Sequence, residues 1–141
     1  MPLWNESYSV FVPEMDKEHR QFLYLLKRVS RAIGKKYSLE ATIEVLDDAL
    51  EYANTHFTAE EKMLEDHKYP GLNEQKAQHA EFIYQMRKLS TSYHEGNPIT
   101  PLATINYLSE WFIKHIQGTD KLYGLHFKSQ NITPANGSLV A

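Results

Sequence analysis

The stretch that decides the fold runs from residue 43 to residue 64 and reads IEVLDDALEYANTHFTAEEKML. Apolar side chains recur in it at helical spacing, namely Ile43, Leu46, Leu50, Ala53, Phe57 and Leu64. This spacing places them on one face of a helix, so the stretch predicts a long amphipathic α-helix. His56 and Glu60 are four residues apart and follow the same face, so the helix is expected to bury an imidazole and a carboxylate together.

The rest of the chain carries three further apolar stripes with the same period. They consist of Phe22, Leu26, Val29 and Ile33, then Phe82, Met86 and Leu89, and then Leu102, Ile105, Leu108, Phe112 and Ile116. Turn signals separate the stripes at GKK (34–36), KYPG (68–71) and EGNP (95–98). We therefore predict helices near residues 14–35, 38–67, 71–95 and 100–124. Because the connections are short, the expected fold class is all-α, an antiparallel up-down-up-down four-helix bundle.

The length and composition favour a single domain. A chain of 141 residues with 42% hydrophobic content is long enough for one core. We expect this domain to span residues 1–127, including an N-terminal arm before Pro13 in which Trp4, Tyr8 and Phe11 pack. The polar segment KSQNITPANGSLVA, residues 128–141, is predicted to be a flexible tail.

Charge and composition limit which kinds of molecule the protein is expected to bind. The formal net charge is −3 and Lys and Arg form no block, so nothing predicts binding to nucleic acid or to an anionic membrane. No apolar run reaches the roughly 18 residues of a membrane span, and MPLWNESYSV does not resemble a signal peptide. We expect a cytoplasmic monomer, with a weak oligomer as the alternative. Since cysteine is absent, any metal must be bound by His, Asp or Glu.

Polar residues continue the buried stripes of all four predicted helices: His19, His56, Glu60, Gln75, His79, His115 and Asp120. One inward histidine is usually a hydrogen-bonded core residue. Buried carboxylates, however, need a cation or a proton, and no Lys or Arg lies on these stripes. A metal site is therefore the hypothesis that explains the whole set. Nitrogen and oxygen ligands suit iron, zinc, copper or nickel, and carboxylates shared by two ions favour iron or manganese.

Spacing gives further expectations for this site. The pair His56 and Glu60 and the pair Gln75 and His79 are each four residues apart, so each pair shares a helix face. The step from His115 to Asp120 is five residues, about 140° past a full turn of an ideal helix. These two side chains are therefore expected to approach the bundle axis from different sides.

Four motifs together resemble the bacterial hemerythrins, which are four-helix di-iron proteins. They are WNESYSVFVPEMDKEHRQF (4–22), HFTAEEKMLEDHKYPG (56–71), QKAQHAEF (75–82) and WFIKHIQGTDKLY (111–123). The resemblance implies two non-heme irons, cycling between Fe²⁺ and Fe³⁺, bridged by Glu60, Asp120 and an oxo or hydroxo group. It implies that His19 and His56 bind the iron that is open to dioxygen, and that His79 and His115 bind the other.

One position departs from the family pattern. The family has a third histidine on the second iron, four residues before the one matched by His79, and this chain has Gln75 there. The resemblance implies a dioxygen-binding protein for storage, delivery or sensing. The glutamine keeps two alternatives open: a di-iron oxidase, peroxidase or oxygenase with an exchangeable position, and a metal-storage or degenerate bundle.

Neighbouring residues carry smaller expectations. Phe112 and Ile116 are expected either to line an apolar oxygen pocket or simply to fill the core. Tyr123 either donates a hydrogen bond near the metals or packs. His67 is expected at the surface, with replacement of the missing ligand as the alternative.

Overall fold

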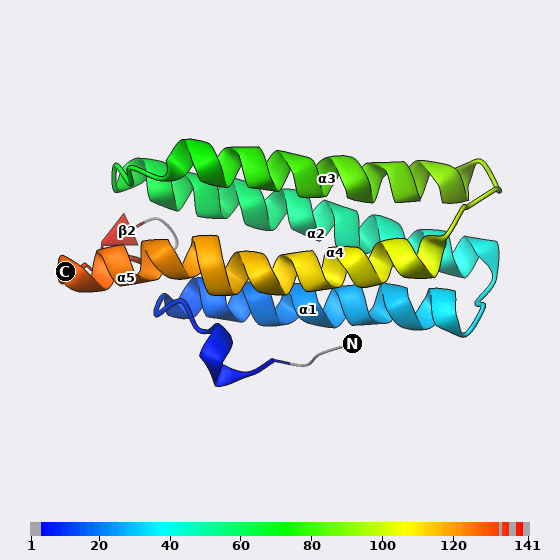
Figure 1. Cartoon of the computed structure of the whole chain (residues 1–141), viewed down its shortest axis with the longest axis horizontal. Coiled ribbons are helices and arrows are strands. Elements are labelled where there is room, and N and C mark those ends of the chain that lie inside the picture. The colour runs from blue at the N-terminus through cyan, green and yellow to red at the C-terminus, as the bar shows by residue number, and fades with distance from the viewer. Residues whose placement is uncertain (1–3, 133, 136–137, 140–141) are drawn as a thin grey trace.

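A computed structural model describes residues 4–132, 134–135 and 138–139 of the chain. Its three longest helices are α1 (Pro13–Gly34), α2 (Leu39–Asp66) and α3 (Leu72–His94). The fourth rod of the bundle comprises α4 (Pro101–His115), a π-helical segment η2 (Ile116–Asp120) and α5 (Lys121–Ser129), which follow one another without a break. Successive rods run antiparallel, as Figure 1 shows. The predicted all-α four-helix bundle is therefore confirmed.

The helix ends follow from local chemistry. Pro13 and Pro101 occupy first-turn positions, where the missing N–H of proline costs nothing. Ser38 caps α2, since its hydroxyl accepts a hydrogen bond from the amide of Ala41 at 3.1 Å. The first three predicted helices agree with the structure to within one residue at each end.

The fourth rod is longer than predicted. The prediction ended it at residue 124, whereas α5 continues to Ser129. Gly124, where the predicted helix ended, lies within the helix in the structure and against the carbonyl of Val10, where a Cβ atom would overlap that carbonyl. The glycine therefore permits a close backbone approach and does not end the helix.

The segment predicted as a tail thus begins inside α5. Beyond that helix, β1 (Pro134–Ala135) pairs antiparallel with β2 (Ser138–Leu139). The predicted flexibility of the tail otherwise concerns residues 133, 136–137 and 140–141, which lie outside the described residues.

The N-terminal arm, which includes the short 3₁₀ helix η1 (Glu6–Tyr8), is docked on the bundle. The amide of Val10 and the hydroxyl of Ser9 both donate to the carboxylate of Asp16, at 2.8 Å and 2.6 Å. The ammonium group of Lys121 donates to two carbonyls of the arm. These contacts fasten the arm to the start of α1 and to the fourth rod, at the junction of η2 and α5.

One predicted packing residue of the arm is exposed. Trp4 and Tyr8 pack edge to face, with ring centroids 5.7 Å apart. Phe11 adopts a positive φ of 62°, which turns its side chain outward, and it is 41% exposed. Its neighbours Val10 and Val12 are buried instead, so the prediction that Phe11 packs into the domain was wrong.

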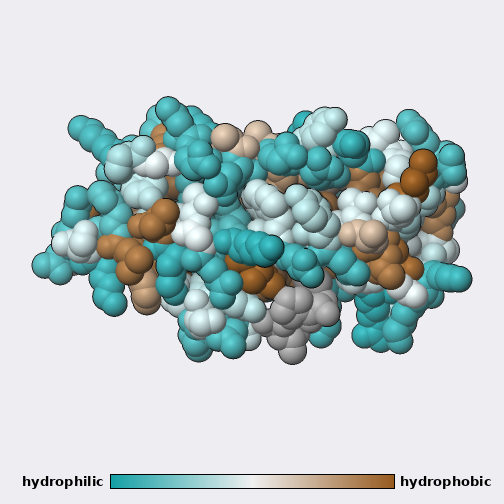
Figure 2. Space-filling view, viewed as in Figure 1, coloured by the Kyte–Doolittle hydropathy of each residue, from teal (hydrophilic) through white to brown (hydrophobic). Residues whose placement is uncertain are grey.

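The face of the molecule seen in Figure 2 is mostly hydrophilic, with apolar residues in separate patches, some of them over α5. No helix among the described residues is both long and apolar enough to cross a membrane.

Candidate metal centre

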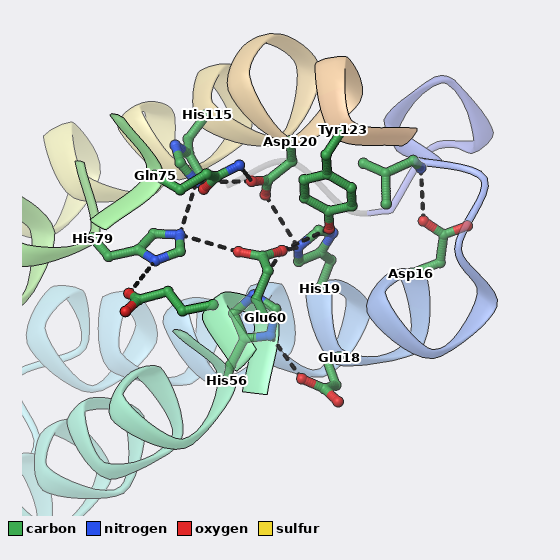
Figure 3. A network of polar contacts seen from close by, with 12 residues as sticks. Asp16, Glu18, His19, His56, Glu60, Gln75, His79, His115, Asp120 and Tyr123 are labelled. Carbon is green, nitrogen blue, oxygen red and sulfur yellow. Dashed lines mark hydrogen bonds and ion pairs between the residues drawn. The ribbon is translucent and has the colours of Figure 1, made fainter. Parts of the chain in front are cut away.

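All seven predicted site residues are buried and lie together between the four rods (Figure 3). His19 comes from α1, His56 and Glu60 from α2, and Gln75 and His79 from α3. His115 is the last residue of α4 and Asp120 the last of η2. The structure therefore brings every predicted residue to one place.

The ligand-type side chains form two adjacent groups. One group comprises His19, His56 and Glu60, and the other comprises Glu60, His79, His115 and Asp120. Within each group the potential ligand atoms lie within 4.8 Å of one another. Glu60 belongs to both groups, and Asp120 also reaches the first, with its Oδ2 3.2 Å from Nε2 of His19. Two neighbouring cations that share two carboxylates would fit this arrangement.

The π-helical segment aligns His115 with Asp120. In a π-helix, hydrogen bonds join residues five apart, so such residues lie one above the other along the helix. Nε2 of His115 is consequently 3.0 Å from Oδ1 of Asp120. The expectation that these two side chains approach from different sides was wrong, because it assumed regular α-helical geometry.

Three of the four imidazoles donate a hydrogen bond from Nδ1 to a residue outside the predicted set of seven. Nδ1 of His56 donates to Glu18 at 2.8 Å, and Nδ1 of His79 donates to Glu61 at 2.8 Å. Nδ1 of His115 donates to Oε1 of Gln78 at 2.7 Å.

These outer acceptors follow a sequence pattern. Glu18 and Gln78 each precede a predicted site residue, and Glu61 follows one. Each is therefore rotated about 100° from the inward direction and reaches the histidine of the next helix. Nδ1 of His19 has no such partner within the described residues.

The donor set fits a metal because the inner nitrogen atoms have no protons to offer when the rings are neutral. A ring whose Nδ1–H donates outward presents the lone pair of Nε2 inward. Nε2 of His79 lies 3.2 Å from Nε2 of His115 and 3.0 Å from Oε1 of Glu60. Nε2 of His56 is buried, and no described residue forms a hydrogen bond with it. So many electron-rich atoms at these distances require positive charge between them.

Without a metal, protons supply that charge. Burial lowers the pKa of His19, but hydrogen bonds to Asp120 and Glu60 outweigh it and raise the pKa to about 10. For His79, burial is likewise outweighed by hydrogen bonds to Glu60 and Glu61, and the pKa rises to about 9. Burial raises the pKa of Glu60, but the facing histidines outweigh it and hold that pKa well below its ordinary value. Metal ions would replace these protons.

Gln75 is oriented by a carboxylate. Its amide nitrogen donates to Oδ1 of Asp120 at 2.8 Å, the same oxygen that His115 approaches. Its carbonyl oxygen is buried and has no hydrogen-bond partner in the part of the chain that the structure describes. Gln75 thus lies on the side of His79 and His115, where the resemblance implies a histidine, and it offers one free oxygen there.

Tyr123, Phe57 and Trp111 pack against the side chains of the site. The Tyr123 hydroxyl donates to Oε2 of Glu60 at 2.7 Å, which confirms the hydrogen-bonding alternative for this residue. Its pKa is raised well above 10 by burial and by the charge of Glu60. Phe57 stacks on His79 and Trp111 on His115, with interplanar angles of 7° and 9°.

The remaining expectations concern Phe112, Ile116 and His67. Phe112 and Ile116 are fully buried, and the Phe112 ring meets His19 edge to face at 5.7 Å. His67 lies at the end of α2, where its Nδ1 donates to the carbonyl of Met63, and it belongs to neither group. It therefore does not replace the missing histidine.

Comparison with known proteins agrees with this geometry. The family model described as "Hemerythrin HHE cation binding domain" matches residues 10–125. The chain is 28% identical to a myohemerythrin of Theromyzon tessulatum over 120 residues, 85% of this chain and 88% of that protein. It is 27% identical to a bacteriohemerythrin of Stenotrophomonas maltophilia over 128 residues, 90% of this chain and 82% of that protein.

A crystal structure of wild-type hemerythrin has the same fold. It superposes with a TM-score of 0.81 at 22% identity and covers 89% of this chain and 95% of its own. Since the family model matches most of the chain, from the end of the arm into α5, the chain belongs to the family of hemerythrin HHE cation-binding domains.

Proposed function

We propose that this chain binds dioxygen, for storage, delivery or sensing, at a pair of non-heme irons held by His19, His56, Glu60, His79, His115 and Asp120. Proteins of the hemerythrin family bind oxygen at a di-iron centre with a bridging oxo or hydroxo group. The observation that carries the proposal is the pair of ligand groups that share Glu60, with inward Nε2 atoms and outward Nδ1 donors.

The protein's own residues set the conditions for this binding. Glu60 and Asp120 reach both groups and would hold both irons, while two histidines on each side would complete the ligand sets. When bound, a ferrous pair supplies the electrons for reversible dioxygen binding. Glu18, Glu61 and Gln78 fix the orientation of three rings, and a fixed ring is a better ligand than a mobile one.

The apolar surroundings restrict water and protons. Phe22 and Phe112 pack against each other, with ring centroids 4.5 Å apart, and both contact the histidine rings. Ile116 lies one residue after His115 and is fully buried. Apolar side chains that exclude water hinder proton delivery to bound dioxygen. They thereby favour the release of intact dioxygen over irreversible oxidation of the irons.

Anaerobic reconstitution with ferrous iron tests the proposal. We expect two irons per chain and a visible absorption band that appears when oxygen is admitted and disappears when it is removed. Fewer than two irons, or a colour that oxygen removal does not reverse, would count against it.

Gln75 supports a second candidate, an oxidase, peroxidase or oxygenase. An amide oxygen binds iron more weakly than imidazole, so this position would exchange with solvent or substrate more easily. Sustained consumption of hydrogen peroxide by the iron-loaded protein, abolished by the Gln75→His change, would favour this candidate. Oxygen binding without turnover would favour the carrier or sensor.

A further inference from the structure

The arm and the outer face of α1 enclose a groove of about 610 Å³. This volume lies within the range of about 300–1,000 Å³ typical of small-molecule sites. Its apolar lining comes from Trp4 on the arm and from Leu23 and Tyr24 on α1. Arg20 also lines the groove. It directly follows His19 in the sequence, but its side chain is exposed, whereas the side chain of His19 is buried in the bundle.

The groove concentrates positive charge. Residues 20–36 contain six Lys or Arg and no Asp or Glu, although the whole chain carries a net charge of −3. Four of these cations line the groove: Arg20, Lys27, Arg28 and Arg31. Among the described residues, none of the four has a carboxylate oxygen within the 4.0 Å of an ion pair. Four of the six cations of this stretch therefore lie along one side of α1 in the folded protein.

The apolar wall of the groove is held in place. The Trp4 ring is braced by Tyr8 at its edge and by the guanidinium of Arg20, which lies 5.0 Å from the ring centroid. The indole N–H donates to Glu6 at 3.1 Å. Leu23 is only 3% exposed and forms part of the apolar floor. A preformed apolar wall loses little entropy when a ligand binds.

We propose that this groove binds a small amphiphilic organic anion, with its apolar body against Trp4 and Leu23 and its anionic group beside Lys27, Arg28 and Arg31. Guanidinium groups match carboxylate, sulfate and phosphate oxygens, and their hydrogen bonds to anions are among the stronger ones in proteins. A purely inorganic anion would leave the apolar wall in water, and a cation would be repelled. The site faces away from the metal centre and does not depend on it.

The test uses dodecanoate, kept below its micelle concentration, and calorimetry on the full iron-loaded chain. We expect saturable 1:1 binding of dodecanoate, and at least about tenfold weaker binding of dodecyltrimethylammonium, which has the same tail and the opposite charge. Inorganic phosphate alone should bind at least about tenfold more weakly as well. Equal binding of the two amphiphiles would overturn the proposal, because it would indicate partition into any apolar surface.

Two matched double variants locate the site. Arg28→Gln with Arg31→Gln should weaken dodecanoate binding at least about tenfold, since each lost charge-assisted contact is worth about a factor of ten. Lys76→Gln with Arg87→Gln changes the net charge equally on the exposed face of α3 and should change binding less than about twofold. All four positions are exposed, so the fold is expected to survive, and circular dichroism checks this.

Two outcomes would contradict a specific groove. Equal weakening by both double variants would mean that only net charge matters. Co-sedimentation with phosphatidylglycerol vesicles, together with no binding of free dodecanoate, would mean that the basic face recognises a membrane surface and not a free molecule.

Discussion

The amide nitrogen of Gln75 lies 2.8 Å from Oδ1 of Asp120, and the amide oxygen of the same side chain has no hydrogen-bond partner among the described residues. The hydrogen bond fixes the glutamine as a donor to a proposed bridging carboxylate, so that its remaining oxygen is the atom available to a metal. The position where the resemblance implies a histidine is thus an ordered part of the site.

The Gln75→His change should strengthen iron retention. An imidazole is a better iron ligand than an amide oxygen, so loss of iron to a chelator should slow at least about tenfold, and the oxygenated form should last longer. Gln85→His on the same helix is the control, because the hydrogen bond of Gln85 among the described residues goes to Glu81, away from the site. Unchanged iron loss in both variants would show that residue 75 does not reach the metals.

Removal of an outer acceptor should weaken metal binding from a distance. Glu61→Ala leaves Nδ1 of His79 without its partner at 2.8 Å, so iron affinity is expected to fall by about 10–100-fold. Competition with a chelator measures this. Glu65→Ala, at an exposed position one turn along α2, should leave the affinity unchanged. If both variants behave like the wild-type chain, the ring of His79 is fixed by something else.

The hydroxyl of Tyr123 should contribute to stability even without metal. Tyr123→Phe removes the 2.7 Å hydrogen bond to the buried carboxylate of Glu60, and bonds to charged groups contribute about 1.5–3 kcal/mol. Urea unfolding of the metal-free protein measures the difference. Tyr107→Phe, at a side chain that is 60% exposed, should change stability by less than about 0.5 kcal/mol. Equal effects of the two changes would argue against this hydrogen bond.

A methyl group at position 124 should loosen the arm. Gly124→Ala places a Cβ against the carbonyl of Val10, and such overpacking costs about 1–3 kcal/mol. We expect a lower melting temperature and faster proteolysis before Pro13. Gly34→Ala, where nothing lies within 4 Å of the added Cβ, should alter stability by less than about 1 kcal/mol. An unaltered arm in Gly124→Ala would mean that the contact with Val10 is dispensable.

The sequence was most informative where the hydrophobic period continued into polar residues. His56 and Glu60 follow directly from the stripe of Phe57, and the buried cluster of site residues follows from the same reasoning on each helix. Glu61 could not be found in this way, because it lies off the stripe and has the pattern of an ordinary exposed charge. Its role depends on the distance to a neighbouring helix, which no single-helix pattern contains.

Two backbone features were also inaccessible to pattern analysis. The spacing of apolar side chains does not show whether the backbone hydrogen bonds join residues four or five apart. The sequence therefore predicted α-helix where the structure has η2. The role of Gly124 was not visible in the sequence either, because the carbonyl of Val10 that it approaches belongs to a distant part of the chain.

The π-helical segment η2 affects how many residues can separate His115 from Asp120. One π-turn accommodates a single extra residue, while the helices on either side still turn the same faces toward the bundle axis. Deletion of Gly118, whose Cβ position has open space around it, would turn η2 into ordinary α-helix. Asp120 and Tyr123 would still face the bundle axis. A variant of this chain with one residue fewer between His115 and Asp120 is therefore expected to build the same site.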